Sequence, residues 1–355
     1  MRRITNLSLP APLSKQNYAK FSTILLDDEE RIIQINDIEE NQPFNESESW
    51  NGDFLSPMGF DLQINGGLGL SFSELNLTSL RKISELQYHL WGEGVEGICP
   101  TIISCDLNYL RSALSILRQA RLRNTANKCE IFGAHLEGPF LKDIRKGAHP
   151  EEHLCMPSLQ SLEERINGFE NEIALMTIAP EISGAFSVIE RLNQLGVKTS
   201  IGHSDADDVI AKKAFAKGVS MLTHTFNAMP PLLHRSPGPI GEALINGTVS
   251  IGLIADGVHV HPTMAVLLQK LAKDQLFLVS DAISAYGLGE GLYKWDDRKV
   301  SVSNFSCRLE DGTLAGSTLP LLEGVKKLAT WSGEPSASIW AGTVSPRLVL
   351  GHFEH

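Results

Sequence analysis

The sequence has few cysteines, and their spacing suits neither a disulfide framework nor a cysteine metal site. Five cysteines occur in 355 residues, and no pair forms a CxxC motif. An odd number of cysteines without such a motif argues against a disulfide scaffold and against a zinc knot. This usage predicts a protein of the reducing cytoplasm.

Long apolar runs and an excess of positive charge are also missing. No stretch approaches the ~18 uninterrupted apolar residues that a membrane-spanning helix needs. The N-terminal Met1-Arg2-Arg3 is not followed by the apolar segment of a secretory signal. The net charge of −11 argues against a general nucleic-acid or anionic-membrane surface. We therefore expect no nucleic-acid partner and no membrane, and a small-molecule substrate remains open, including an anionic one.

What the sequence does contain is a regular alternation of short apolar strands and helical segments from residue 58 onward. Eight strands are predicted, at Phe60 to Asn65, Gly94 to Ile103, Ile131 to Glu137, Ile173 to Ala179, Val197 to His203, Met221 to His224, Val249 to Asp256 and Leu276 to Asp281. Apolar residues spaced three and four apart predict helices at Leu80 to Trp91, Leu107 to Arg121, Ala185 to Leu195, Ala206 to Phe215 and Pro262 to Lys273. Eight strands alternating with helices predict an α/β protein with a (β/α)8 barrel of the TIM type.

The segments on either side of this pattern differ from it. The predicted division is a small β appendage at residues 1–56, the barrel at 57–350 and a tail at 351–355. Within the appendage, Asp27 to Glu30 reads as a hairpin turn, and the polar segment 41–53 reads as a loop. Within the barrel, the Gly-, Asp- and Ser-rich stretch at about 286–316 predicts a β-hairpin insertion.

Side chains suited to metal binding fall where the predicted strands end. Glu137 ends the third strand, His203 the fifth, His224 the sixth and Asp281 the eighth. In a barrel these ends converge on one mouth. One carboxylate and two imidazoles suit a catalytic divalent metal that keeps positions open for water and substrate. Each histidine alone is more often structural, and each carboxylate more often a cap, but their joint occurrence favours a metal hydrolase.

The same residues suggest a reaction. A divalent metal lowers the pKa of bound water towards ~7 and polarises a carbonyl. Asp281, placed beside that water, can take its proton and pass it to the leaving group. No GxSxG elbow is present, and no cysteine is indicated as a nucleophile. The pattern therefore predicts hydrolysis of an amide or ester without a covalent intermediate.

A set of segments, in order along the chain, supports a closer comparison. These are Gly59 to Gly66, His135 to Phe140, Lys146 to His149, Gly202 to Ala206, Thr223-His224 with Asn227 to Met229, His234 to Gly238, Ala255 to Val260, Ser280 to Ala282 and Gly312 to Ser317. Together they resemble the N-acetylglucosamine-6-phosphate deacetylases of the amidohydrolase superfamily, from about residue 57 to 350. The resemblance implies removal of acetate from N-acetyl-D-glucosamine 6-phosphate, leaving D-glucosamine 6-phosphate, in amino-sugar catabolism or recycling.

The resemblance also implies roles for individual residues. It assigns Glu137, His203 and His224 to one divalent metal ion per subunit, with zinc expected and iron, manganese or cobalt as alternatives. It assigns Asp281 as the general base and acid, and His149 as the residue that polarises the acetyl carbonyl. Contacts to the sugar phosphate are implied for Ala148, Asn227, Ala228, Arg235, His259, Leu314, Ala315, Gly316 and Ser317.

Two of these assignments have simpler alternatives from the residues alone. A guanidinium is the natural bidentate partner of a phosphate, but Arg235 could equally form a surface ion pair. His259 could equally be a loop histidine. The resemblance further implies a homodimer, in which Arg235 could serve the neighbouring pocket.

The sequence departs from the superfamily pattern in two of its predicted barrel strands and at its C-terminal end. Many members carry His-x-His on the first strand and bind two metals, whereas this chain has Gln63 and Asn65 there, which we expect to surround the site rather than bind a second ion. Strand four has no lysine between Ile173 and Glu181 to bridge two ions. The family usually continues beyond Gly351 into strands of the β domain, so an incomplete β-sandwich appendage is expected here.

Two other functions remain compatible with the residues. A related amidohydrolase acting on a cyclic amide, or a deaminase, could use the same metal and aspartate. A non-catalytic sugar-phosphate binder is the alternative from a different class, although a binder has no need of Asp281. Arg235 and the Asn227-Ala228 segment favour the phosphorylated amino sugar.

Overall fold

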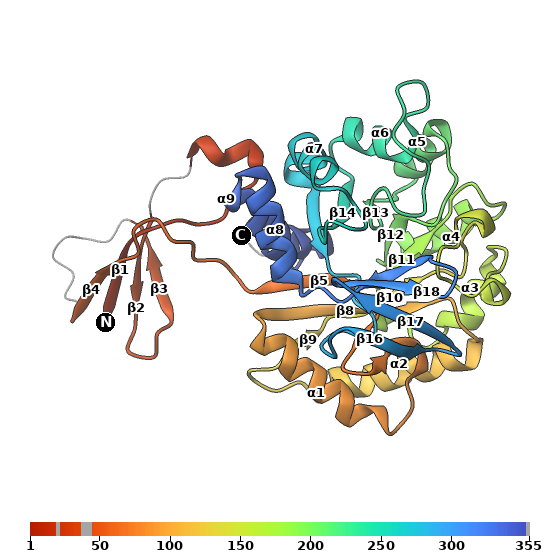
Figure 1. The fold of residues 1–355 in the computed structure, drawn as a ribbon, viewed down its shortest axis with the longest axis horizontal. Coiled ribbons are helices and arrows are strands. Elements are labelled where there is room, and N and C mark those ends of the chain that lie inside the picture. Colours follow the sequence, from red (N-terminus) through yellow and green to blue (C-terminus); the bar gives the residue numbers. More distant parts are fainter. Residues whose placement is uncertain (19–21, 37–44, 353–355) are drawn as a thin grey trace.

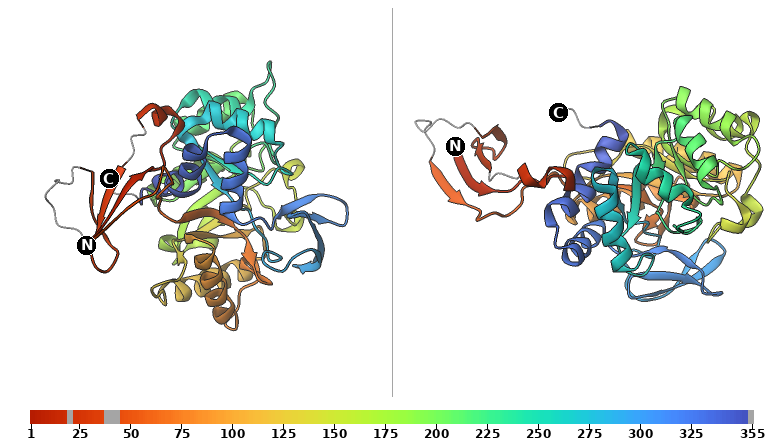
Figure 2. Two further views of the ribbon diagram at one scale, coloured as in Figure 1. Left: turned by 60° about the vertical axis from the view of Figure 1, so that its left-hand side comes forward. Right: turned by 90° about the horizontal axis from the view of Figure 1, so that it is seen from above.

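The computed structural model describes residues 1–18, 22–36 and 45–352. A small sheet at the N-terminal end lies to one side of a large barrel, and all three views separate these two parts (Figures 1 and 2). Among the described residues, no helix is both long and apolar enough to cross a membrane.

Eight parallel strands form the barrel, as predicted. In chain order they are β5 (Gly59–Ile64), β8 (Val95–Ile103), β10 (Ala134–Glu137), β11 (Ile173–Ile178), β12 (Lys198–Ile201), β13 (Met221–Leu222), β14 (Ser250–Ile254) and β15 (Leu276–Val279). Most of their residues are buried, because the barrel interior covers one face and the helices cover the other. The last four strands end earlier than predicted, so His203, His224, Asp256 and Asp281 lie on the loops just beyond them.

Helices cover the outside of the barrel. They are α1 (Ser79–Gly92), α2 (Leu107–Arg121), α3 (Leu159–Ile166), α4 (Ala185–Gln194), α5 (Asp208–Ala216), α6 (Gly238–Asn246), α7 (Pro262–Ala272), α8 (Leu321–Ser332), α9 (Pro335–Thr343) and α10 (Ser345–Leu350). The predicted helix at Ala206 begins two residues later, because the Asp207 side chain accepts from the Ile210 N–H and caps the first turn there. Short pieces complete the barrel region: β6 (Gly66–Gly67), β7 (Leu70–Ser71), β9 (Glu130–Ile131), η2 (Phe72–Glu74), η3 (Asp143–Arg145), η4 (Glu151–His153), η5 (Glu170–Glu172) and η6 (Lys273–Gln275).

The barrel closes where its first and last strands meet. The Asp281 N–H donates to the Gln63 carbonyl at 2.9 Å, and the Asn65 N–H donates to the Ala282 carbonyl at 2.7 Å. The buried Asp61 carboxylate, on β5, accepts from the Ser280 N–H at 3.2 Å. This seam holds Asp281 beside the amide side chains of β5.

The inside of the barrel is layered. An apolar layer near the start of the strands includes Phe60 and Phe277, and a Cβ on Gly97 would lie 2.3 Å from the Phe60 ring, so glycine is needed there. Above it lies a polar layer, in which His135 Nε2 is 2.8 Å from Thr177 Oγ1. His135 is buried in this layer, where burial is the main cause that lowers its pKa to about 4. The polar layer separates the apolar floor from the mouth.

The N-terminal sheet has four strands in the order β3-β2-β1-β4. They are β1 (Arg2–Leu7), β2 (Ser22–Leu26), β3 (Ile32–Ile35) and β4 (Glu46–Ser49), and the 3₁₀ helix η1 (Leu13–Tyr18) follows β1. The hairpin between β2 and β3 agrees with the prediction. The loop predicted at 41–53 is wrong in part, because residues 46–49 form β4 and pair with β1; residues 41–44 lie outside the described residues.

The insertion after the last barrel strand is larger than the predicted single hairpin. Four antiparallel strands form it: β16 (Gly291–Trp295), β17 (Arg298–Ser303), β18 (Ser306–Leu309) and β19 (Leu314–Ser317). Trp295, Val300 and Val302 pack with Ile103 and Ile283 from the barrel into one apolar cluster. The insertion is therefore attached to the mouth by its own small core.

The opposite end of the barrel is covered by α10. Its Arg347 is buried, donates to the Met58 carbonyl at 2.8 Å, and pairs with Glu96 at the start of β8. The His352 ring packs edge-on against Phe132, with ring centroids 4.7 Å apart. The described end of the chain therefore lies at the floor of the barrel, away from the mouth.

Candidate functional site

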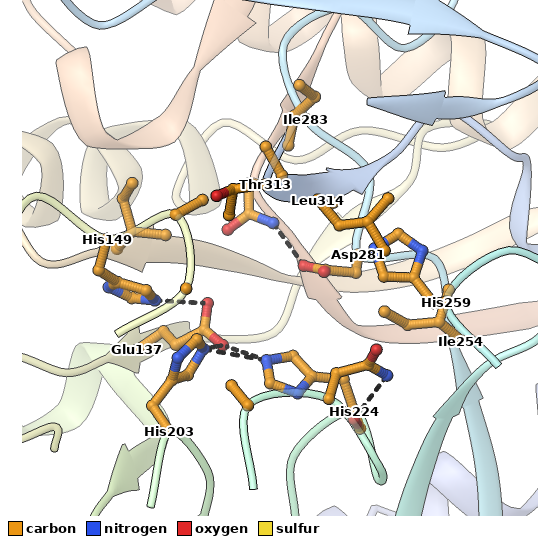
Figure 3. A pocket seen from close by; sticks show the side chains of 18 of the residues that line it. Glu137, His149, His203, His224, Ile254, His259, Asp281, Ile283, Thr313 and Leu314 are labelled. Atoms are coloured by element: carbon orange, nitrogen blue, oxygen red, sulfur yellow. Dashed lines mark hydrogen bonds and ion pairs between the residues drawn. The ribbon is translucent and has the colours of Figure 1, made fainter. Parts of the chain in front are cut away.

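A pocket of about 350 Å³ opens at the mouth of the barrel. Glu137, His149, His203, His224 and Asp281 all line it, and Figure 3 shows how their side chains approach one another. All five are more than nine-tenths buried. The structure therefore brings together residues that are up to 144 positions apart in the sequence (137 to 281).

Three atoms in this pocket that could bind a metal form a small triangle. Glu137 Oε1 lies 3.1 Å from His224 Nε2 and 3.3 Å from His203 Nε2, and the two Nε2 atoms are 3.1 Å apart. Zinc ligands at about 2.0–2.1 Å in tetrahedral geometry lie about 3.3 Å from each other. The triangle therefore has the dimensions of three ligands around one divalent cation.

The loops that carry these residues have unusual backbone conformations. His203, His224 and Asp281 have φ angles of 49°, 28° and 49°, in the left-handed region that side chains other than glycine rarely adopt. Each lies two residues beyond the end of its barrel strand. Strained residues of this kind cluster at functional sites, where the surrounding fold holds them in place.

Hydrogen bonds at Nδ1 give two of the histidines different chemistry. His203 Nδ1 lies 2.8 Å from the Arg145 carbonyl, which can only accept, so Nδ1 carries the proton and Nε2 keeps a lone pair for a metal. His149 Nδ1 accepts from the Ser104 N–H at 3.3 Å and lies 3.0 Å from the Ser104 hydroxyl; with this hydroxyl donating as well, the His149 proton is on Nε2, which faces the pocket 3.7 Å from Glu137 Oε2. Glu137, His149 and His203 all have ligand atoms within 4.8 Å of one another. The proton arrangement nevertheless suits His149 as a hydrogen-bond donor and His203 as a ligand.

Amide side chains from β5 hold the two carboxylates. Gln63 Nε2 donates to Glu137 Oε1 at 2.9 Å, and Asn65 Nδ2 donates to Asp281 Oδ1 at 2.7 Å. Through these N–H groups the two amides act as hydrogen-bond donors that orient the carboxylates. This contact leaves Asp281 Oδ2 free towards the pocket.

The electrostatics of the pocket follow from burial and close packing of charge. Burial would raise the pKa of Glu137, but its interactions with the neighbouring His149, His203 and His224 outweigh burial and hold that pKa well below its usual range. Burial, followed by the charge of Glu137, raises the pKa of Asp281 to about 6. Burial, followed by the neighbouring His203, lowers the pKa of His149 to about 4 and keeps its ring neutral.

The chemistry of the donor set fits a divalent metal. Two buried imidazole nitrogens lie 3.1 Å apart and face the same carboxylate oxygen, and a divalent cation bound among these three atoms would compensate their converging lone pairs. Glu137, His203 and His224 could hold it. Asp281 and the Nε2–H of His149 line the same pocket and could act on a ligand bound beside the cation.

Most of the residues predicted to contact substrate line the same pocket. These are Ala148, Asn227, Ala228, His259, Leu314, Ala315 and Gly316. Ser317 is not among the lining residues, because its hydroxyl donates to the Ser280 carbonyl at 2.6 Å and ties β19 to the barrel. Arg235 is not among them either, since it is exposed on the loop before α6 with its guanidinium beside His234.

His259 is held in a defined orientation at the edge of the pocket. Its Nδ1 lies 2.7 Å from Asp256 Oδ2, and its backbone N–H donates to Asp256 Oδ1 at 2.8 Å. The carboxylate therefore fixes the ring and leaves Nε2 available to a ligand. This agrees with a binding histidine better than with a free loop histidine.

Several pocket residues were not predicted from the sequence. They are Ile103, Ile144, Arg145, Gly147, Ile254, Ile283, Trp295 and Thr313. Arg145 directly precedes the Lys146 to His149 segment, and that position was the available signal. The insertion strand that carries Trp295 gave no signal of its own.

A parallel eight-stranded barrel with a carboxylate and imidazoles converging at the carboxyl ends of its strands, beside an aspartate, defines the class of metal-dependent amidohydrolases. No protein-family model matches the chain. Curated relatives do: N-acetylglucosamine-6-phosphate deacetylase of Vibrio furnissii is 32% identical over 286 residues, covering 81% of this chain and 71% of the relative. N-acetylgalactosamine-6-phosphate deacetylase of Escherichia coli O157:H7 is 31% identical over 300 residues, covering 84% and 78%.

A solved structure gives the same picture. The crystal structure of N-acetylglucosamine-6-phosphate deacetylase from Thermotoga maritima matches with a TM-score of 0.81 and 29% identity, covering 98% of this chain and 90% of that one. The chain belongs to the N-acetylglucosamine-6-phosphate deacetylase family. The predicted resemblance and fold class are thereby confirmed.

Proposed function

We propose that the protein removes the acetyl group of N-acetyl-D-glucosamine 6-phosphate, giving D-glucosamine 6-phosphate and acetate. The observation that carries this proposal is the triangle of Glu137 Oε1, His203 Nε2 and His224 Nε2 beside Asp281 in one pocket. Membership of the deacetylase family supplies the substrate class. Products of this reaction belong to amino-sugar metabolism.

One divalent metal ion per subunit is proposed for Glu137, His203 and His224, with zinc as the first candidate and iron, manganese or cobalt as alternatives. When bound there, such an ion supplies a Lewis acid that polarises a carbonyl and makes water a better nucleophile near neutral pH. Amides are poorer zinc ligands than imidazoles, so Gln63 and Asn65 in place of two histidines support one ion rather than two.

The residues of the chain then have distinct tasks. The Nε2–H of His149 donates to the acetyl carbonyl oxygen and stabilises the negative charge that develops there. Asp281 Oδ2, left free because Asn65 holds Oδ1, takes a proton from the attacking water as the C–O bond forms. The carboxyl group of Asp281 then gives this proton to the amide nitrogen as the C–N bond breaks. Water is thus divided between acetate and the released amine.

Replacing Asp281 by Asn tests this proposal. Turnover should fall about 10²–10⁴-fold, the usual contribution of a general base, while the metal content stays the same. Acetate release and metal content of the purified protein would be measured together. A variant that keeps wild-type turnover would overturn the role of Asp281.

An epimeric substrate is the second candidate. A relative at 31% identity is N-acetylgalactosamine-6-phosphate deacetylase, and the two sugars differ only at the C4 hydroxyl. The ratio of kcat/KM for the two 6-phosphates would identify the preferred sugar. Release of acetate from neither sugar, with a cyclic amide hydrolysed instead, would contradict the proposal as a whole.

Arg235 and the subunit arrangement belong to the same proposal. The Arg235 guanidinium is exposed and lies outside the pocket of its own chain. Because the proposed substrate carries a phosphate, which a guanidinium binds well, this position supports a homodimer in which Arg235 completes the partner's pocket. Arg235→Met should raise KM more than it lowers kcat.

We also propose a cytoplasmic location, supported by five free cysteines.

A further inference from the structure

Two loops meet at the imidazole of His203. The first follows β10 and includes residues 142–147; the second follows β12 and includes residues 203–205. They are joined in both directions, since the Lys142 N–H donates to the His203 carbonyl at 2.8 Å and His203 Nδ1–H donates to the Arg145 carbonyl at 2.8 Å. A Cβ on Gly147, whose φ is +57°, would lie 3.4 Å from the His203 ring. The first loop therefore packs directly against the ligand histidine.

A charged pair closes the same two loops on the outside. Arg145 Nε and one terminal nitrogen of its guanidinium donate to Asp205 Oδ1 at 2.9 and 2.8 Å. Asp205 is itself fixed, because its N–H donates to Glu181 Oε1 at 2.6 Å and the neighbouring Ser204 hydroxyl donates to Glu181 Oε2 at 2.8 Å. Glu181 follows β11, so three successive barrel loops are connected in one network.

We propose that Arg145 and Asp205 are positioning residues for His203. Their ion pair fixes the loop that carries the Arg145 carbonyl, and this carbonyl sets the proton position and the ring plane of His203. Outer hydrogen bonds of this kind orient a ligand histidine and raise its basicity. The inference rests on the proposed function, in which His203 binds the metal.

The network makes a prediction that a stabilising role would not make. The Arg145 and Asp205 side chains are each about one-third exposed, at 32% and 39%. An ion pair with this exposure contributes little to the stability of the fold. If the pair acts on His203, its loss changes metal affinity and leaves the melting temperature of the metal-stripped protein almost unchanged.

The test uses the full chain, stripped of metal and titrated with zinc against a competing chelator. Asp205→Asn and Arg145→Met should each weaken zinc binding about tenfold, as expected for an outer hydrogen-bonding partner. The double variant should be no weaker than either single variant, because both remove the same contact. The visible absorption of the cobalt(II)-loaded variants should change as well, since it reports the geometry of the ligands.

A matched control is available in another exposed ion pair. Glu190 Oε1 accepts from Lys217 Nζ at 2.7 Å with both side chains about half exposed, and neither residue lines the pocket. Glu190→Gln makes the same charge change as Asp205→Asn, and should leave zinc affinity and the cobalt spectrum as in the wild type. Equal zinc affinity for Asp205→Asn and Glu190→Gln would overturn the positioning role.

One further variant separates this inference from the proposed function. His203→Gln should lose most of the zinc affinity. If His203→Gln binds zinc like the wild type, the ligand assignment fails and the positioning role fails with it. If His203→Gln loses zinc while Asp205→Asn and Arg145→Met do not, the ligand assignment stands and only the positioning role is wrong.

Discussion

Two histidines of the pocket, His149 and His203, carry their protons on opposite ring nitrogens. The carbonyl of Arg145 accepts from His203 and leaves the inner nitrogen of that ring unprotonated. The N–H of Ser104 donates to His149 and leaves its inner nitrogen protonated. Both rings lie close to Glu137, so their positions alone do not distinguish their roles. The backbone group at each Nδ1 does: it makes His203 a metal ligand and His149 a hydrogen-bond donor.

This difference predicts the effect of removing His149. His149→Ala should lower kcat about 10²–10³-fold, the typical loss when a donor to a developing oxyanion is removed. The metal content should remain one ion per subunit, because His149 is not a ligand. Metal analysis and steady-state kinetics on the same preparation check both. Loss of the metal together with the activity would make His149 a ligand instead.

At the scale of residues, the sequence was sufficient to predict a site residue where a polar side chain directly ends an apolar strand. Glu137, His203, His224 and Asp281 could be selected because polar residues that end apolar strands meet at a barrel mouth. The Arg145 carbonyl could not be predicted, since a backbone group has no sequence signature. Only the resemblance pointed to His149, which lies on a loop rather than at a strand end. The roles of these residues stay predictions until variants are measured.

At the scale of elements, the seam between β5 and β15 contains a buried carboxylate. Burial is the main cause that raises the pKa of Asp61 to about 7, against an ordinary value of 3.8, although it accepts backbone N–H groups from Gln63 and Ser280. A raised pKa in the folded state means that the folded protein holds this proton more tightly than the unfolded chain does.

The stability of the protein should therefore depend on pH through Asp61. Its contribution is complete below about pH 4 and is lost as the pH rises to about 7, at up to about 1.4 kcal/mol per pH unit. Asp61→Asn should lack this pH-dependent contribution. The free energy of unfolding of the variant, relative to that of the wild type, should therefore increase as the pH rises from about 4 to about 7. Urea unfolding of metal-stripped protein at pH 4, 5.5 and 7.5 measures it. Asp297→Asn, at a fully exposed aspartate, is the control, and identical profiles for the two variants would contradict the prediction.

The Arg298 side chain joins the insertion sheet to the loop that carries His149. Arg298 donates to the Ala148 carbonyl at 2.8 Å, and its guanidinium lies 4.9 Å from the centre of the Trp295 ring. Ala148 directly precedes His149, so this contact links the insertion to the pocket wall.

Breaking that link should affect the reaction without affecting the metal. Arg298→Met should lower kcat/KM about tenfold, since small displacements of a positioned group are costly, and should leave zinc affinity unchanged. Lys299→Met, at the next and exposed position of the same strand, should behave like the wild type. Equal kinetics for the two variants would show that the insertion does not position the pocket wall.

Elements were predictable in proportion to their burial. The barrel strands have continuous apolar stretches, because both of their faces are covered, and all eight were found. Strand β4, with the sequence Glu-Ser-Glu-Ser, is exposed on both faces and has no apolar pattern to detect. The insertion was underestimated for a similar reason, since its four short strands are separated by Gly- and Asp-rich turns.

At the scale of the whole molecule, a bound cation would contribute to the stability of the fold. Its proposed ligands come from three different barrel loops, so the cation would connect parts of the chain that separate on unfolding. A ligand present at 1,000 times its dissociation constant stabilises the folded state by about 4 kcal/mol.

Chelation should consequently lower the melting temperature by on the order of 10 °C, given about 2–4 °C per kcal/mol for a domain of this size class. Restoring zinc should restore the melting temperature. Thermal unfolding with and without a chelator, followed by circular dichroism, measures the shift. The His203→Gln variant should show a much smaller shift, and an unchanged melting temperature in the wild type would argue against a site of this affinity.

The position of α10 and His352 has a practical meaning for work with this protein. Arg347 and His352 lie against Met58, Glu96 and Phe132, at the end of the barrel opposite the pocket. A surface or fluorophore attached through residue 352 would therefore face away from incoming substrate. Immobilised molecules would all present their catalytic openings to the bulk solution, which favours single-molecule and flow-cell assays.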